Sequence, residues 1–255
     1  MSSTKQMNRK DFIESFYQDG FAHVRSCITQ GEHRELSRQI ERYKRETVPK
    51  LKPTEVFYEI CGQPNELKQL QRMDQHDEWF SKFALQSRWL ELAESMLRHR
   101  VVLSGVEWFN KPPKTGKPTP PHQDGYYFCL KPDEAVTFWF AIDRVDEKNG
   151  CLHYTPGSHL RGVRPHGTSR ILGFSQAILD FDHEDHANEW LAKMEPGDMV
   201  SHHSRTIHWA DGNSSKRTRQ SLALVFFSEN AQRDEEAFGR YQDSVNRQHG
   251  EMGIS

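Results

Sequence analysis

The pattern of apolar and polar positions changes near residue 100 of this 255-residue chain. Before that point apolar residues recur every three or four positions, which is the spacing of amphipathic helices. The stripes predict a helix over about residues 11–20, a second through residues 36–43 toward Pro49, and a third over about residues 78–97. We expect these helices to buttress a sheet rather than to carry the function.

From Val101 onward the apolar residues gather in short runs rich in β-branched and aromatic side chains, which is typical of strands. Turn dipeptides such as Asn149-Gly150 separate these runs. The predicted strands cover residues 101–109, 136–142, 151–155, 199–203 and 218–227. Helices followed by many short strands predict an α+β chain. We expect a double-stranded β-helix, that is, a jelly-roll or cupin-like barrel, buttressed by N-terminal helices.

The length fits a single domain over residues 1–255. We expect a helical buttress over about 8–97, a jelly-roll core over about 100–228, and a tail over 229–255 that is either a docking helix or partly disordered. Residues 160–196 show little periodicity, and long loops in compact domains are often functional, so this segment is a candidate substrate lid. Its run Asp180–His186 fits a second metal site or, more simply, a solvated loop with scattered histidines.

Composition narrows the range of partners. The chain carries 34 basic and 36 acidic residues, so it lacks the excess of positive charge that is typical of proteins that bind nucleic acid or anionic membranes. Its longest apolar run, residues 135–142, is far shorter than the roughly twenty residues that cross a bilayer, and its first residues lack the apolar core of a secretory signal. The four cysteines form no Cys-x-x-Cys pair, which argues against a zinc knuckle or a disulfide framework. We therefore expect a cytoplasmic protein that acts on a small molecule.

The segment His122-Gln123-Asp124 is the most informative motif. In an extended strand, residues two apart point to the same face, so His122 and Asp124 can reach one ion while Gln123 points toward the neighbouring strand. His208, from a strand distant in sequence, would complete two imidazoles and one carboxylate on one face of an octahedral metal. The other face stays open for substrate, co-substrate and oxygen, as in iron(II) oxygenases. The motif is short, and alone it also fits a surface turn ahead of Gly125.

Arg219 lies in the apolar strand predicted over residues 217–227. The alternation of the strand sets Arg219, Ser221, Ala223 and Val225 on one face. A guanidinium that enters a core needs a carboxylate partner, because an unpaired buried charge is unfavourable. A bound dicarboxylic acid could be that partner through a bidentate pair. The alternative is an arginine at the sheet edge that pairs with an Asp or Glu of the chain.

Several ordered motifs agree with one known family. From Asp19-Gly20-Phe21 to about Phe227, the chain resembles the phytanoyl-CoA dioxygenase family of iron(II)/2-oxoglutarate oxygenases. The resemblance is carried by the stretch from Asn110 to Asp124, followed in order by Trp139, Glu147 to Leu152, Pro156 to His159, Gly197-Asp198, His203, His208, Asn213 and Arg219.

The resemblance implies His122, Asp124 and His208 as the catalytic residues that bind Fe(II). It further implies Arg219 as the partner of the distal carboxylate of 2-oxoglutarate, with Trp139 and Gln123 lining the co-substrate pocket. One departure is visible, because family members often have Ser two residues after the distal His, where this chain has Ala210. A hydroxyl contact to the co-substrate is therefore missing or supplied elsewhere. Halogenating relatives replace the metal carboxylate by a small residue, whereas Asp124 is present here, which favours hydroxylation.

The implied activity is hydroxylation of an aliphatic C–H bond of a small molecule, with O2 and 2-oxoglutarate consumed and succinate and CO2 released. The basic residues Arg161, Arg164 and Lys117 are candidates for binding an anionic substrate, although basic residues of this kind are also common on protein surfaces. Candidates for the substrate wall are the aromatic residues Trp108, Tyr126, Phe128, His153 and His203. The alternative is a jelly-roll metalloprotein without oxygenase activity, either a metal-dependent isomerase or a dicarboxylate sensor, because the ligand set also admits zinc or manganese.

Overall fold

The computed structural model describes residues 9–52, 54–60, 63–171 and 174–251. Its α-helices are α1 (Arg9–Asp19), α2 (Gln30–Glu46), α3 (Met73–His76), α4 (Glu78–Ala84), α5 (Ser87–Leu97), α6 (Asp124–Phe128), α7 (His183–Ala187) and α8 (Glu235–Glu251). Short 3-10 helices are η1 (Val48–Lys50), η2 (Pro64–Glu66), η3 (Glu147–Asn149) and η4 (Ser158–Arg161). The strands are β1 (Phe21–Val24), β2 (Val56–Tyr58), β3 (Leu67–Leu70), β4 (Val101–Lys111), β5 (Thr119–His122), β6 (Leu130–Lys131), β7 (Ala135–Ala141), β8 (Leu152–Tyr154), β9 (His166–Ile171), β10 (Phe174–Ile178), β11 (Trp190–Leu191), β12 (Met199–His203), β13 (His208–Ala210), β14 (Arg219–Ser228) and β15 (Gln232–Arg233).

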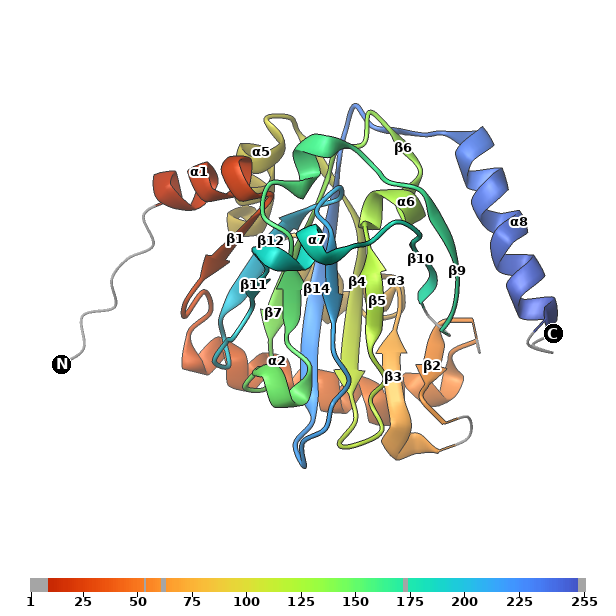
Figure 1. Ribbon diagram of the computed structural model, residues 1–255. Coiled ribbons are helices and arrows are strands. Elements are labelled where there is room, and N and C mark those ends of the chain that lie inside the picture. Colours follow the sequence, from red (N-terminus) through yellow and green to blue (C-terminus); the bar gives the residue numbers. More distant parts are fainter. Residues whose placement is uncertain (1–8, 53, 61–62, 172–173, 252–255) are drawn as a thin grey trace.

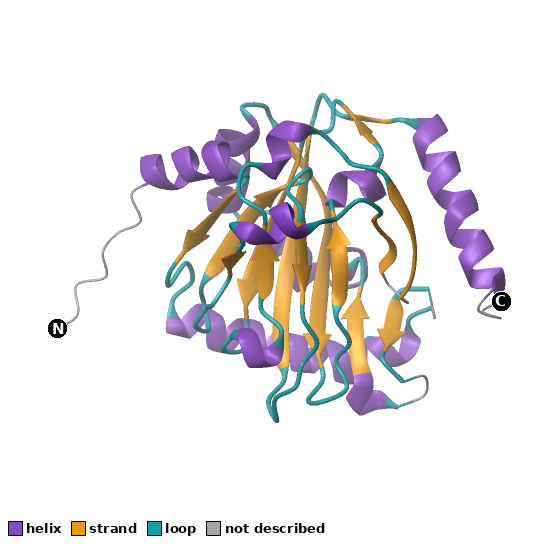
Figure 2. Ribbon diagram, viewed as in Figure 1, coloured by secondary structure: helices purple, strands orange, loops and turns teal. Residues whose placement is uncertain are grey.

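Two antiparallel sheets form the barrel. The major sheet has the order β1-β12-β7-β14-β4-β3-β2, and the minor sheet has the order β11-β8-β13-β5. Residues of both sheets meet in one apolar cluster, in which Trp139 and Ala223 of the major sheet join Leu152, Tyr154 and Ala210 of the minor sheet. Figure 2 shows the strands gathered in the centre with the helices around them. The expected helix-buttressed jelly roll is therefore confirmed.

The alternation along β14 separates the two sides of the major sheet. Leu222, Leu224 and Phe226 face a core that also contains Leu36, Ile40 and Tyr43 of α2. The long helix α2 runs across the strands near the bottom of Figure 1. Residues of the opposite face of β14 point into the barrel. The two-residue period of one strand thus supplies both the helical core and the interior of the barrel.

Two local sequence features fix the start of α2 and the end of α1. The helix α2 begins with a capping box, in which the Thr29 hydroxyl accepts from the Glu32 amide and the Glu32 carboxylate accepts from the Thr29 amide. The helix α1 ends at Gly20, whose φ of +85° favours glycine. A Cβ at Gly20 would lie 2.5 Å from the His159 ring, so the chain turns directly into β1 only with glycine there.

The secondary structure differs from the sequence expectations in several respects. The helix predicted over residues 78–97 is two helices, α4 and α5, because Gln86 is extended (φ −60°, ψ 137°) and interrupts the apolar stripe. The segment 160–196 holds a hairpin of β9 and β10 and the short helix α7, rather than a loop without structure. The tail forms α8, which is the helical alternative of the two expected for it, and α8 stands on the side of the barrel away from α1 (Figure 1). In the part of the chain that is described, no helix is both long and apolar enough to cross a membrane.

Candidate metal centre

His122, Asp124 and His208 converge in the barrel from three elements. His122 is the last residue of β5, and His208 is the first residue of β13, directly opposite it in the antiparallel register. The strand ends at His122, so the expectation that Asp124 shares a strand face with it is wrong. Gln123 is still extended (φ −127°, ψ 127°), and Asp124 begins the short helix α6. This bend at the end of the strand turns the carboxylate back toward the two imidazoles.

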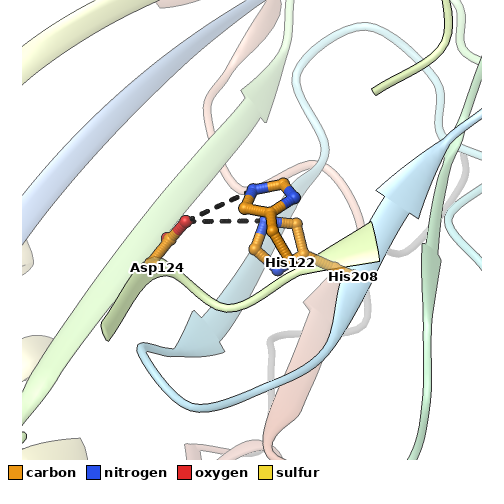
Figure 3. Close-up of side chains that lie close together, drawn as sticks. All are labelled: His122, Asp124 and His208. Atoms are coloured by element: carbon orange, nitrogen blue, oxygen red, sulfur yellow. Dashed lines mark ion pairs between the residues drawn. The ribbon is translucent and has the colours of Figure 1, made fainter. Parts of the chain in front are cut away.

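Figure 3 shows the three side chains pointing toward one another. The Oδ1 atom of Asp124 lies 3.6 Å from Nε2 of His122 and 3.6 Å from Nε2 of His208. One ligand atom from each residue lies within 4.8 Å of the others, and both imidazoles are buried. Among the described residues this is the one group of His, Cys, Asp or Glu that meets this spacing. The run Asp180–His186 forms no such group, so a second metal site there has no structural support.

Hydrogen bonds fix the tautomers of the two imidazoles. Nδ1 of His122 donates to the Pro120 carbonyl at 2.8 Å, and Nδ1 of His208 donates to the Thr206 carbonyl at 3.0 Å. Each Nε2 atom is therefore left unprotonated and faces the shared point, which is the orientation that metal-binding imidazoles adopt. Burial lowers the pKa of both rings, so they are neutral near pH 7.

Asp124 is ionised in this setting. Burial acts to raise the pKa of its carboxyl group, but the neighbouring imidazoles of His208 and His202 lower it more, and the net pKa lies below the usual value. Its second oxygen, Oδ2, accepts hydrogen bonds from the Thr137 hydroxyl and from Nε2 of His202. Two neutral imidazoles and one carboxylate form a donor set that suits a divalent first-row transition metal such as iron(II).

Arg219 lies in the same cavity as the three ligands. It is 4% exposed, and burial lowers its pKa to about 10, which leaves the guanidinium charged at neutral pH. Its Nη1 donates to the Ser221 hydroxyl at 3.3 Å, and its Nε has no hydrogen-bond partner. Within the described ranges no carboxylate forms an ion pair with it. The expected alternative, an edge arginine paired with an acidic residue, therefore does not hold.

A second basic residue, Lys111, lies beside Arg219. Lys111 pairs with Arg219 across β4 and β14, is 3% exposed, and has a pKa that burial and the neighbouring guanidinium lower. Its Nζ donates to the Lys117 carbonyl and to the Thr119 hydroxyl. Trp139, expected at the co-substrate pocket, also lines the cavity, with its ring centroid 5.3 Å from the guanidinium carbon. This end of the cavity is built for an anion.

Gln123 does not lie where the resemblance implies. It is buried, but it is not part of the cavity wall. Its Nε2 donates to the carbonyls of Gly162 and Arg205, and its Oε1 accepts from the Arg164 amide. The expectation that Gln123 contacts the co-substrate is therefore not supported by its position. It instead ties the metal-binding segment to the chain that follows η4.

The predicted substrate wall is mostly elsewhere. Phe128 lines the cavity. The other aromatic candidates lie outside it, because Trp108 faces the helical core, Tyr126 stacks on His166, His153 stacks on Trp209, and His203 packs against Phe16. Two of the three basic residues proposed for an anionic substrate, Arg161 and Arg164, are in ion pairs. Arg164 pairs with Asp180 and Asp185, and Arg161 lies 3.5 Å from Asp185.

The cavity contains polar residues that the sequence did not single out. Glu107 lines it from β4 and accepts a hydrogen bond from Gln69, and burial raises the pKa of Glu107 to about 7. Glu59 and Lys68 line the same wall as a buried ion pair at 3.5 Å. The sequence contains one signal for Glu107, because the alternation of β4 sets Glu107 on the same face of the strand as Lys111. It contains no such signal for Glu59 and Lys68.

The chain is similar in sequence to known phytanoyl-CoA dioxygenases. The chain is 27% identical over 228 residues to the peroxisomal phytanoyl-CoA dioxygenase of Homo sapiens, covering 84% of this chain and 67% of that protein. It is 30% identical over 164 residues to the Bos taurus protein, covering 61% of this chain and 48% of that protein. The matches thus span between about half and two thirds of these relatives' length.

Solved structures share the fold. EvdO2 from Micromonospora carbonacea var. aurantiaca superposes with a TM-score of 0.67 at 26% identity, covering 86% of this chain and 90% of that one. The epimerase SnoN, in complex with Fe3+, alpha ketoglutarate and nogalamycin RO, gives a TM-score of 0.71 at 22% identity, covering 88% and 84%. The family description "Phytanoyl-CoA dioxygenase (PhyH)" matches residues 16–221, most of the chain. This protein therefore belongs to the phytanoyl-CoA dioxygenase family.

Proposed function

We propose that this protein is an iron(II)- and 2-oxoglutarate-dependent dioxygenase that hydroxylates an aliphatic C–H bond of a small molecule. In the overall reaction, substrate, O2 and 2-oxoglutarate give the alcohol, succinate and CO2, so that one oxygen atom enters the product and the other enters succinate. The observation that carries the proposal is the buried guanidinium of Arg219, which has no carboxylate partner in the described part of the chain and shares one cavity with three converging metal ligands. EvdO2 was solved in complex with 2-oxoglutarate. SnoN was solved in complex with Fe3+ and with alpha ketoglutarate, which is the same compound as 2-oxoglutarate.

His122, Asp124 and His208 would hold the metal, which supplies the activation of O2 when it is bound. The chain contributes binding and orientation. Arg219 would form a bidentate pair with the distal carboxylate of 2-oxoglutarate, and the adjacent Lys111 would add a second positive charge. Trp139 forms a wall beside the guanidinium. A bound diacid would supply a carboxylate partner for Arg219, which has none among the described residues.

Thr119 supplies the hydroxyl that Ala210 does not. The two residues pair directly across β5 and β13, so the Thr119 hydroxyl stands beside the position where relatives often have serine. It lines the cavity and lies 3.3 Å from Nζ of Lys111. We assign it a hydrogen bond to the distal carboxylate of the co-substrate.

Hydroxylation is favoured because Asp124 would hold the position that a halide takes in halogenating relatives. Arg161 and Arg164 do not support an anionic substrate, because they are engaged with Asp180 and Asp185. The substrate side of the cavity instead combines apolar residues, among them Phe128 and Val225, with the polar wall around Glu107.

The proposal is tested by adding iron(II) and then 2-oxoglutarate to the protein without oxygen. We expect a weak visible charge-transfer band that requires both additions. Arg219→Ala should leave iron binding intact and raise the 2-oxoglutarate concentration needed for the band by at least tenfold, because a charge-assisted bidentate pair is lost. The matched control is Arg217→Ala, which removes an exposed arginine two residues away that pairs with Asp146.

Succinate release, measured over a panel of small molecules, then identifies the substrate. Absence of the band together with tight binding of another metal would refute the oxygenase assignment and favour a metalloprotein of another activity. Loss of iron binding in Arg219→Ala would show that the guanidinium is structural.

A further inference from the structure

His202 contacts the carboxylate of the metal centre without belonging to the ligand set. It lies on β12 and is 2% exposed. Its Nε2 lies 3.1 Å from Oδ2 of Asp124, and the Thr137 hydroxyl donates to the same oxygen at 3.0 Å. The Oδ1 atom is the one that faces His122 and His208. The two oxygens of one carboxylate therefore have different surroundings.

Tyr154 fixes the orientation of His202. Its hydroxyl lies 2.9 Å from Nδ1 of His202, and the side chain is completely buried. An ionised carboxylate only accepts hydrogen bonds, so Nε2 of His202 must donate to Asp124. In the neutral imidazole Nδ1 then accepts, and the Tyr154 hydroxyl donates to it. The chain of donors runs in one direction, from Tyr154 through His202 to Asp124.

This chain links the two sheets of the barrel. Tyr154 comes from β8 of the minor sheet, His202 and Thr137 come from β12 and β7 of the major sheet, and Asp124 lies on the short helix between β5 and β6. The carboxylate is thus held by groups that the closed barrel fixes in space. A helix of five residues could not hold it as firmly by itself.

We propose that His202, oriented by Tyr154, is a positioning residue that reserves Oδ2 of Asp124 and so presents the carboxylate to the metal through Oδ1 alone. This inference rests on the proposed function, since it assumes that the three ligands bind a metal ion. Coordination through one oxygen keeps a position open for the co-substrate and O2, whereas a bidentate carboxylate would occupy it. Residues that orient metal ligands typically change metal affinity 10–100-fold when they are removed.

The alternative is that His202 only fills space. Its ring lies 4.6 Å from the His208 ring and 5.5 Å from the Tyr154 ring, centroid to centroid, so it also packs the interior. The two roles differ in what replaces the imidazole. Phenylalanine retains an aromatic ring of similar size without a donor. Glutamine places an amide donor near the position of Nε2 and lacks the ring.

The experiment is a Mn(II) titration of the metal-free full chain, with unbound Mn(II) read from its electron paramagnetic resonance signal. His202→Phe should weaken Mn(II) binding 10–100-fold, and His202→Gln should recover most of that loss. Tyr154→Phe should weaken binding in the same direction by a smaller factor. In the His202→Phe background, Tyr154→Phe should have no further effect, because it acts through the imidazole.

Wild-type affinity in His202→Phe would overturn the inference, and so would equal losses in His202→Phe and His202→Gln, which indicate packing alone. If His202→Phe does not fold, Tyr154→Phe decides, since unchanged Mn(II) affinity there excludes the donor chain. Failure of the wild-type protein to bind Mn(II) or iron(II) would instead refute the proposed function. If the wild-type protein binds metal and the variants bind it with the same affinity, only the role of His202 is refuted.

Discussion

Glu107 should make the stability of the metal-free protein fall as the pH rises from 5 to 8. Its carboxyl group lines the cavity, and its hydrogen bond in the structure comes from Gln69 at 3.1 Å. In the part of the chain that is described, no lysine or arginine forms an ion pair with it. Burial therefore dominates and raises the pKa from 4.5 to about 7.

The sign follows from the two states. Below pH 4.5 the carboxyl is protonated in both the folded and the unfolded chain, so burial has no consequence for stability. Between about pH 4.5 and 7 the unfolded chain releases the proton while the folded chain retains it, and the free energy of unfolding decreases. The rise in pKa from 4.5 to about 7 corresponds to about 3 kcal/mol in total, of which about 2.5 kcal/mol is expected between pH 5 and 8.

Glu107→Gln removes this dependence, because the amide has the same shape and its oxygen can still accept from Gln69. Urea unfolding, followed by tryptophan fluorescence in the presence of a chelator, gives the free energy of unfolding of each protein at several pH values. The difference between Glu107→Gln and wild type should grow by about 2.5 kcal/mol from pH 5 to 8. Glu229→Gln, which removes an exposed carboxylate, is the control and should show no such growth. Parallel pH profiles of wild type and Glu107→Gln would refute the reasoning.

Three further variants test the site and the core. His208→Ala should abolish Mn(II) and iron(II) binding together with succinate release; retained binding in a calorimetric titration would exclude His208 as a ligand. Thr119→Val should raise the dissociation constant of 2-oxoglutarate about two- to tenfold through the loss of one hydrogen bond, while Thr119→Ser retains wild-type affinity and an unchanged Val variant would contradict the assigned contact. Phe138→Ala should lower the free energy of unfolding by about 3–5 kcal/mol, because this side chain is fully buried between the major sheet and the helices, and a loss below about 1 kcal/mol would contradict that placement.

The long periodic elements could be predicted from the sequence because burial of one face fixes their pattern. Strand β12 matches its predicted bounds, and β4, β7 and β14 differ from theirs by one or two residues at the ends. The short strands β1, β2 and β3 were not predicted, because three or four residues carry too little alternation to stand out among helices. The break between α4 and α5 also has no glycine or proline to mark it.

The sequence predicted that Asp124 lies with the two imidazoles, but it did not predict the bend of the chain that brings the carboxylate to them. The spacing of the motif assumed one continuous strand, whereas the chain bends after His122 and uses a helix start instead. Gln123 shows the same difficulty, since its role depends on the carbonyls of Gly162 and Arg205, which lie far away in sequence. A residue that binds distant backbone leaves no local signal.

The two imidazoles show why the metal site is easier to predict than its surroundings. Each donates to the carbonyl two residues before it, Pro120 for His122 and Thr206 for His208, so the tautomer of each ligand is set within its own segment. One cross-strand pairing of β5 with β13 then joins the two segments. The wall around Glu107, in contrast, combines Glu59, which follows β2, with Lys68 of β3 and with Glu107 of β4, whose partner Gln69 lies 38 residues away in sequence. Metal chemistry is therefore encoded locally in this chain, while substrate choice is encoded in its tertiary structure.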